Sequence, residues 1–123
     1  MESYKDLIVW QKSMTLVGEI YKLVKLLPKE EVNVLSNQMR RSAISIPSNI
    51  AEGYDRRSTK DYINFLSIAR GSNSELQTQL YICIQLGFLN PSQIQTSISL
   101  TEEISKMLNS LIYKLENRNT NGN

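Results

Sequence analysis

Apolar residues recur at alternating steps of three and four positions along four long segments of this chain of 123 residues. This spacing places side chains on one face of an α-helix, where neighbouring helices can bury them. The segments cover about 6–26, 30–53, 58–86 and 91–116, and we find no stretch between them that reads as a β-strand. The sequence therefore predicts an all-α protein.

Local signals mark the ends of the predicted helices. Pro28 ends the first helix, because the residue before a proline is disfavoured in helical conformation. Ser58 and Asn90 occupy capping positions, and Gly87 suits a helix end. Short connections require neighbouring helices to run in opposite directions. We predict an antiparallel, up-down-up-down four-helix bundle that forms a single domain over 1–116, followed by a disordered polar tail over 117–123.

The first two helices carry less regular patterns. In the first, one three-four seam predicts a buried face, and a second apolar stripe widens it, which indicates contact with two neighbouring helices or with one helix and another subunit. In the second, Pro47 removes a helical hydrogen bond, so we expect a continuous helix kinked there; the alternative is two shorter helices separated at Ile46. The predicted seam is Leu7, Trp10, Met14, Val17, Tyr21 and Val24, the second stripe is Leu16, Ile20, Leu23 and Leu27, and the inner face of the second helix is Val32, Leu35, Met39, Ala43, Ile46 and Ile50.

Polar residues interrupt the apolar stripes of the second and third helices. A buried carboxylate there must find a cation or several hydrogen-bond donors. These residues would form a polar layer that fixes helix register, or simply a solvated face. The other interpretations are pairing across a subunit interface and a ligand site. The candidate polar layer consists of Asn49, Glu52, Arg70, Ser72 and Glu75.

The composition argues against catalysis. Histidine is absent, which removes the commonest general base near neutral pH and the commonest metal ligand. The single cysteine, Cys83, lies among apolar residues, as a small core residue does. We expect no enzymatic activity, no cofactor and no metal site. No stretch approaches the roughly 20 apolar residues of a membrane span, and the amino terminus does not read as a signal peptide, so we expect a cytoplasmic protein.

Basic residues provide the better functional lead, although the net charge is only +2. Arginine presents a planar fork of donors that pairs with phosphate at two points. Tyr54 and Tyr62 would offer stacking surface to unpaired bases. Ordinary solvated helix faces are the alternative explanation. The candidate nucleic-acid-binding residues are Arg40, Arg41, Arg56, Arg57 and Lys60.

A family resemblance is carried by two segments, QMRRSAISIPSNIAEGY and RRSTKDYINFLSIARGSNSELQTQL, together with DLIVWQKSM near the amino terminus. Over about 4–89 the chain resembles the four-helix-bundle family of 23S rRNA intervening-sequence proteins, and it is similar to accessory proteins of diversity-generating retroelements. The resemblance implies a non-enzymatic homo-oligomer, frequently a homopentamer, with structured RNA or nucleoprotein as a partner. The alternative is an oligomeric scaffold or protein-interaction bundle that binds no nucleic acid.

Overall fold

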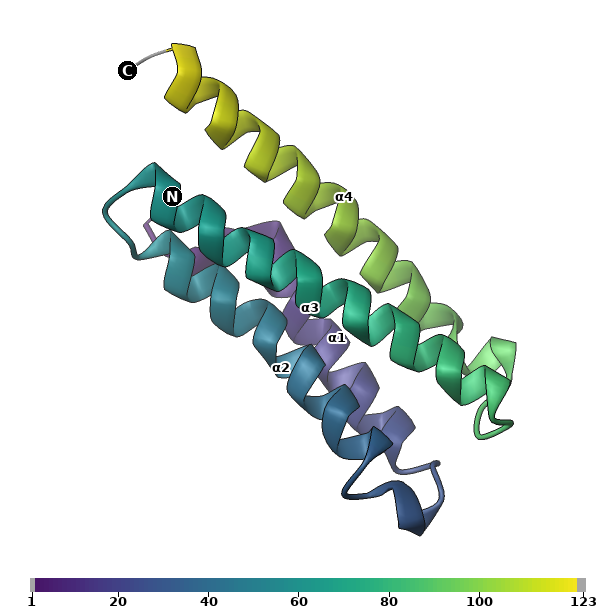
Figure 1. Cartoon of the computed structure of the whole chain (residues 1–123). Coiled ribbons are helices and arrows are strands. Elements are labelled where there is room, and N and C mark those ends of the chain that lie inside the picture. The colour runs from purple at the N-terminus through teal and green to yellow at the C-terminus, as the bar shows by residue number, and fades with distance from the viewer. Residues whose placement is uncertain (1, 122–123) are drawn as a thin grey trace.

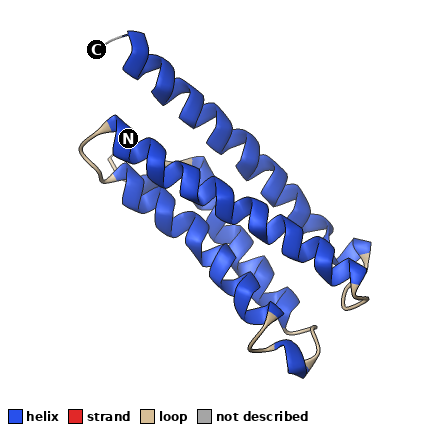
Figure 2. Cartoon of the chain, in the orientation of Figure 1, coloured by secondary structure: helices blue, strands red, loops and turns tan. Residues whose placement is uncertain are grey.

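The computed structural model describes residues 2–121 of the chain and the side chains of residues 2–118. Within the described residues the chain contains helices and short connections, and no strand (Figure 2). Each long helix runs back alongside the one before it, and α1 also contacts α4, which closes a four-helix bundle (Figure 1). The helical elements are η1 (Tyr4–Asp6), α1 (Ile8–Val24), η2 (Lys29–Glu31), α2 (Leu35–Tyr54), α3 (Thr59–Gln85) and α4 (Pro91–Asn121).

The predicted helix ends are confirmed where local chemistry sets them. The Ser58 hydroxyl accepts a hydrogen bond from the Asp61 backbone N–H at 3.1 Å and so caps α3. Asn90 and Gln93 form a reciprocal capping box at the start of α4, each side-chain oxygen accepting from the other residue's backbone N–H. Gly87 ends α3 with a φ of 75°, a conformation that favours glycine.

One hydrophobic core runs between the four long helices. On α3 one stripe at three-four spacing is buried from Leu66 to Cys83, whereas the apolar residues of the adjacent stripe, Ile68, Ile82 and Leu86, are exposed. On α1 the second stripe was predicted to widen the buried face, and its burial is confirmed, with Leu16 and Ile20 fully buried. Of the predicted seam, Val24 is buried, but Met14 and Tyr21 are exposed. The remainder of that seam is partly buried at the edge of the core: Leu7, Trp10 and Val17.

The start of α2 also differs from the prediction. A single 3-10 turn, η2, follows Pro28, and the α-helix begins only at Leu35. The intervening residues Val32, Asn33 and Val34 all have low helix propensity, and Val34 offers no side-chain cap. Val32 is therefore exposed rather than part of the inner face.

Pro47 lies inside α2, which continues through it to Tyr54. The alternative of two helices separated at Ile46 is wrong. Pro47 is buried on the core side, where its missing N–H leaves the Ala43 carbonyl without its usual helical partner. A bend of α2 at this residue stays a prediction.

The last helix extends further than the sequence pattern indicates. It ends at Asn121 rather than near 116, so the first part of the predicted disordered tail is helical. Extending an existing helix costs less than nucleating one, which lets α4 continue beyond Leu115, its last buried residue among those described. Residues 122 and 123 of the predicted tail lie outside the described residues.

Candidate functional site

The basic residues form two groups at opposite ends of α2, rather than the single cluster that their sequence spacing suggests. Arg40 and Arg41 lie near the start of the helix, whereas Arg56 and Arg57 follow its end, and Lys60 lies in the first turn of α3. A rise of about 1.5 Å per residue places the two groups roughly 24 Å apart along the bundle. One phosphate cannot contact both groups, but a single RNA helix could span them.

The two arginines of the first group have different surroundings. Arg40 is partly buried, and its Nη2 donates to the Val32 carbonyl at 3.3 Å. Arg41 is exposed and forms no ion pair with any described residue. Arg41 is thus available to an external anion, while Arg40 is oriented toward the α1–α2 connection.

In the second group, Arg56 is held by two contacts. Its Nη2 lies 3.1 Å from Glu52 Oε2, and its guanidinium carbon lies 4.8 Å from the centroid of the Phe65 ring. Arg57 and Lys60 are exposed and form no ion pair within residues 2–118. Phosphate binding at this end would therefore use Arg57 and Lys60 first.

Tyr54 and Tyr62 pack against each other, which corrects the expectation that both offer free stacking surface. Their rings meet edge to face, with centroids 6.1 Å apart. Burial, and then the neighbouring Tyr54 hydroxyl, raise the pKa of Tyr62 to about 12. This pair stabilises the α2–α3 contact.

A small polar layer does join α2 to α3, through fewer residues than the sequence predicts. The hydroxyl oxygens of Ser45 and Ser72 lie 2.7 Å apart. Asn49 donates from Nδ2 to the Ser45 hydroxyl at 2.9 Å and to the Ser45 carbonyl at 2.8 Å. Ser45 is the central member that sequence reasoning missed, although its spacing of four from Asn49 was a usable signal.

The three charged members of the predicted layer lie elsewhere. Glu52 is exposed and pairs with Arg56. Arg70 donates from Nη1 to Asn109 Oδ1 on α4 at 3.0 Å. Glu75 is exposed on α3 and has no hydrogen-bond or ion-pair partner among the described residues. No buried carboxylate therefore needs a partner here, and the predicted layer is wrong for Glu52, Arg70 and Glu75.

A second polar group connects α3 to α4 inside the bundle. Asn73, which is 2% exposed, donates from Nδ2 to the Thr101 carbonyl at 2.8 Å, while its Oδ1 has no partner among the described residues. Gln77 donates to the Thr101 hydroxyl at 3.0 Å. Asn73 belongs to the buried stripe of α3, but its partner on α4 could not be predicted from the sequence pattern. These contacts fix register and offer no reactive group.

Two further kinds of feature, a metal site and a membrane-spanning helix, were sought in the described part of the chain. No group of three or more acidic or cysteine side chains there could hold a metal ion. No helix among these residues combines the length and apolar character needed to cross a membrane.

Two faces of the bundle expose apolar side chains. Between α1 and α2, a groove of about 360 Å³ is lined by Trp10, Met14 and Ile44, among others. On α3, a second depression of about 410 Å³ lies beside Gly71, Glu75 and Ile82. Met14, Ile44 and Ile82 are all exposed large hydrophobic residues. Exposed apolar surface of this kind is typical of protein contact sites.

The known proteins to which this chain is similar match most of its length. The family model described as 23S rRNA-intervening sequence protein matches residues 5–110. A solved structure of a protein with unknown function from the S23 ribosomal protein family of Bacteroides thetaiotaomicron VPI-5482 is 33% identical, with a TM-score of 0.79. The alignment covers 85% of this chain and 98% of that one. No curated protein matches the chain.

Proposed function

Because this chain belongs to the family of 23S rRNA-intervening sequence proteins, we propose that it is a non-enzymatic, cytoplasmic homo-oligomer that binds structured RNA or ribonucleoprotein. The proposed number of subunits is five, which rests on the family resemblance alone. No cofactor is part of the proposal.

Two exposed basic groups at the ends of α2 carry the RNA-binding part of the proposal. Arg41, Arg57 and Lys60 are exposed, and none forms an ion pair with another described residue. Free surface cations release counterions from the nucleic-acid backbone when they contact phosphates. Each subunit of an oligomer would add its own pair of groups, so a modest charge per chain could still yield strong binding through multiple contacts.

The two exposed apolar faces support the proposal that the protein forms an oligomer. A ring requires two different surfaces on each subunit, because each subunit contacts its two neighbours through unlike patches. The groove beside Met14 and Ile44 and the α3 face beside Ile82 are two such surfaces. We propose that the first face of one subunit packs on the second face of the next.

Measuring affinity for a structured RNA at two salt concentrations tests the proposed function. With about four phosphate contacts, affinity should fall roughly hundredfold between 50 and 200 mM monovalent salt. Absence of binding at 50 mM salt would contradict the proposal. Helicity measured in both buffers by circular dichroism controls for unfolding.

A second candidate function is an oligomeric scaffold that binds no nucleic acid. Exposed Glu75, without a partner among the described residues and beside apolar Ile82, favours it, because such a carboxylate could pair across a subunit contact. Glu75→Ala should then change the oligomer mass in light scattering without loss of helicity. An unchanged mass together with salt-sensitive RNA binding would reject this alternative.

A further inference from the structure

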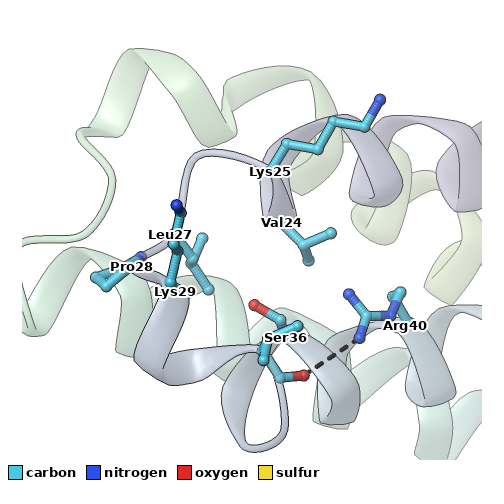
Figure 3. A pocket seen from close by; sticks show the side chains of 8 residues that line it. Val24, Lys25, Leu27, Pro28, Lys29, Ser36 and Arg40 are labelled. Carbon is cyan, nitrogen blue, oxygen red and sulfur yellow. Dashed lines mark hydrogen bonds between the residues drawn. The ribbon is translucent and has the colours of Figure 1, made fainter.

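A cavity of about 430 Å³ lies where the α1–α2 connection meets the start of α2 (Figure 3). Val24, Leu27 and Val32 supply apolar surface to it. Its size is near the lower end of small-molecule sites, which run from about 300 to 1,000 Å³. The cavity therefore has room for one compact group rather than for a long acyl chain.

Three basic residues line the cavity beside this apolar surface, and Figure 3 shows the amino group of Lys25 directed away from Ser36 and Arg40. Figure 3 shows Lys25 coming from the end of α1, Lys29 from the connection and Arg40 from α2. Neither lysine forms an ion pair with another described residue. Arg40 makes one hydrogen bond, to the Val32 carbonyl, so the other N–H donors of its guanidinium are available. The cavity is suited to a ligand with an anionic part and an apolar part.

The nearest carboxylates do not occupy this space. Glu30 and Glu31 follow Lys29 in η2, but neither lines the cavity. No carboxylate among the described residues lines the cavity.

A hydroxyl group also lines the cavity. Ser36 is only 3% exposed and lines the cavity, and Figure 3 shows its hydroxyl on the side toward Leu27, away from Arg40. It forms no hydrogen bond with any other described side chain or backbone group. The hydroxyl oxygen is not among the buried unpaired atoms of the described residues, so it is accessible to a bound group.

We infer that this cavity binds a single unpaired nucleotide of an RNA, with the phosphate on Arg40 and the lysines and the base against the apolar surface. The inference rests on the proposed function. Arginine pairs with phosphate at two points, and proteins commonly read RNA through bases that have left the helix. The Ser36 hydroxyl would hydrogen-bond the edge of the base.

Two RNA stems of the same length test the inference, one fully paired and one with a single bulged adenosine. The wild-type protein should bind the bulged stem roughly tenfold more tightly, the effect of burying one base. Val32→Asn and Arg40→Gln should remove this preference. The matched controls are Val34→Asn, an exposed valine of the same connection outside the cavity, and Arg41→Gln, the other arginine of the pair. Both controls should keep the preference, although Arg41→Gln should weaken binding to both stems equally.

The outcomes distinguish the proposed nucleotide-binding cavity from the proposed RNA binding of the whole protein. Equal, salt-sensitive binding of both stems would overturn the cavity assignment while leaving the proposed function intact. Binding of neither stem would reject both. Methyl NMR of Val24, Leu27 and Val32 adds a direct measurement: we expect shifts with the bulged stem. Shifts with an acetylated Leu-Asp-Asp peptide, and none with the bulged stem, would assign the cavity to acidic protein segments and contradict the inference.

Discussion

Gly53 of α2 lies so close to Phe65 of α3 that a β-carbon added to Gly53 would be 2.8 Å from the Phe65 β-carbon. It would also be 3.0 Å from a ring carbon of Tyr62. Real β-carbons do not approach other heavy atoms so closely, and the nearest atom is attached directly to the α3 backbone. The presence of glycine at position 53 is thus explained by helix packing rather than by a bound ligand.

Gly53→Ala should destabilise the protein. Overpacking at a helix contact costs about 1–3 kcal/mol, which exceeds the gain of up to about 1 kcal/mol in helix propensity. The free energy of unfolding in urea measures the change. Gly71→Ala is the matched control, because a β-carbon there meets nothing within 4 Å, and it should stabilise α3 by about 0.5–1 kcal/mol. Similar effects of the two substitutions would contradict the close packing.

The hydrogen bond between Ser45 and Ser72 should make a measurable contribution to stability. Ser72→Ala leaves the partly buried Ser45 hydroxyl with Asn49 alone, and should cost about 1 kcal/mol. A double-mutant cycle with Ser45→Ala isolates the pair, and we expect a coupling energy of about 0.5–1 kcal/mol. Strictly additive single substitutions would show that the two hydroxyls do not interact.

Stability should fall at alkaline pH because of Cys83. Its folded-state pKa, raised by burial from 9.0 to about 11, exceeds that of the unfolded chain. Above pH 9 the unfolded state loses this proton first, so stability declines with rising pH until the folded-state pKa is passed. Between about pH 8 and pH 10.5 the wild type should lose on the order of 1–2 kcal/mol more than Cys83→Ala does. Parallel pH profiles for the two proteins would contradict a buried, protonated thiol.

The apolar groove between α1 and α2 should control assembly. Met14→Glu or Ile44→Glu places a charge in the proposed subunit contact, where it would be desolvated, and should reduce the oligomer mass in light scattering. Tyr113→Glu is the control, because Tyr113 is 65% exposed, more than Met14 at 47%, and lines neither apolar face. An equal response to Tyr113→Glu would indicate a general effect of negative charge.

Local chemistry made the helix ends and the helical class predictable. The caps at Ser58 and Asn90 and the glycine end at Gly87 depend on residues within a few positions of each other. The α3 stripe was equally clear, since its apolar residues keep one helical period. These features need no knowledge of the neighbouring helices.

Contacts between helices were not predictable in the same way. Both stripes of α1 keep helical spacing, and packing against α2 and α4 buries Leu16 while Met14 stays exposed. Glu52 and Asn49 share a face by spacing, yet Glu52 is exposed and pairs with Arg56, while Asn49 donates to Ser45. The separation of Arg40 from Arg56 could have been foreseen, because the helix predicted over 30–53 continues for more than three turns beyond Arg40.

The most direct test of RNA binding by the two ends of α2 is the affinity of Arg41→Gln/Arg57→Gln for a structured RNA at 50 mM salt. The control, Lys106→Gln/Lys114→Gln, removes the same charge from exposed positions on α4. We predict that the arginine double variant loses at least about tenfold in affinity and has a salt slope shallower by about one for each lost phosphate contact, while the lysine variant loses much less. Equal losses in the two variants, or no loss in either, would contradict the account.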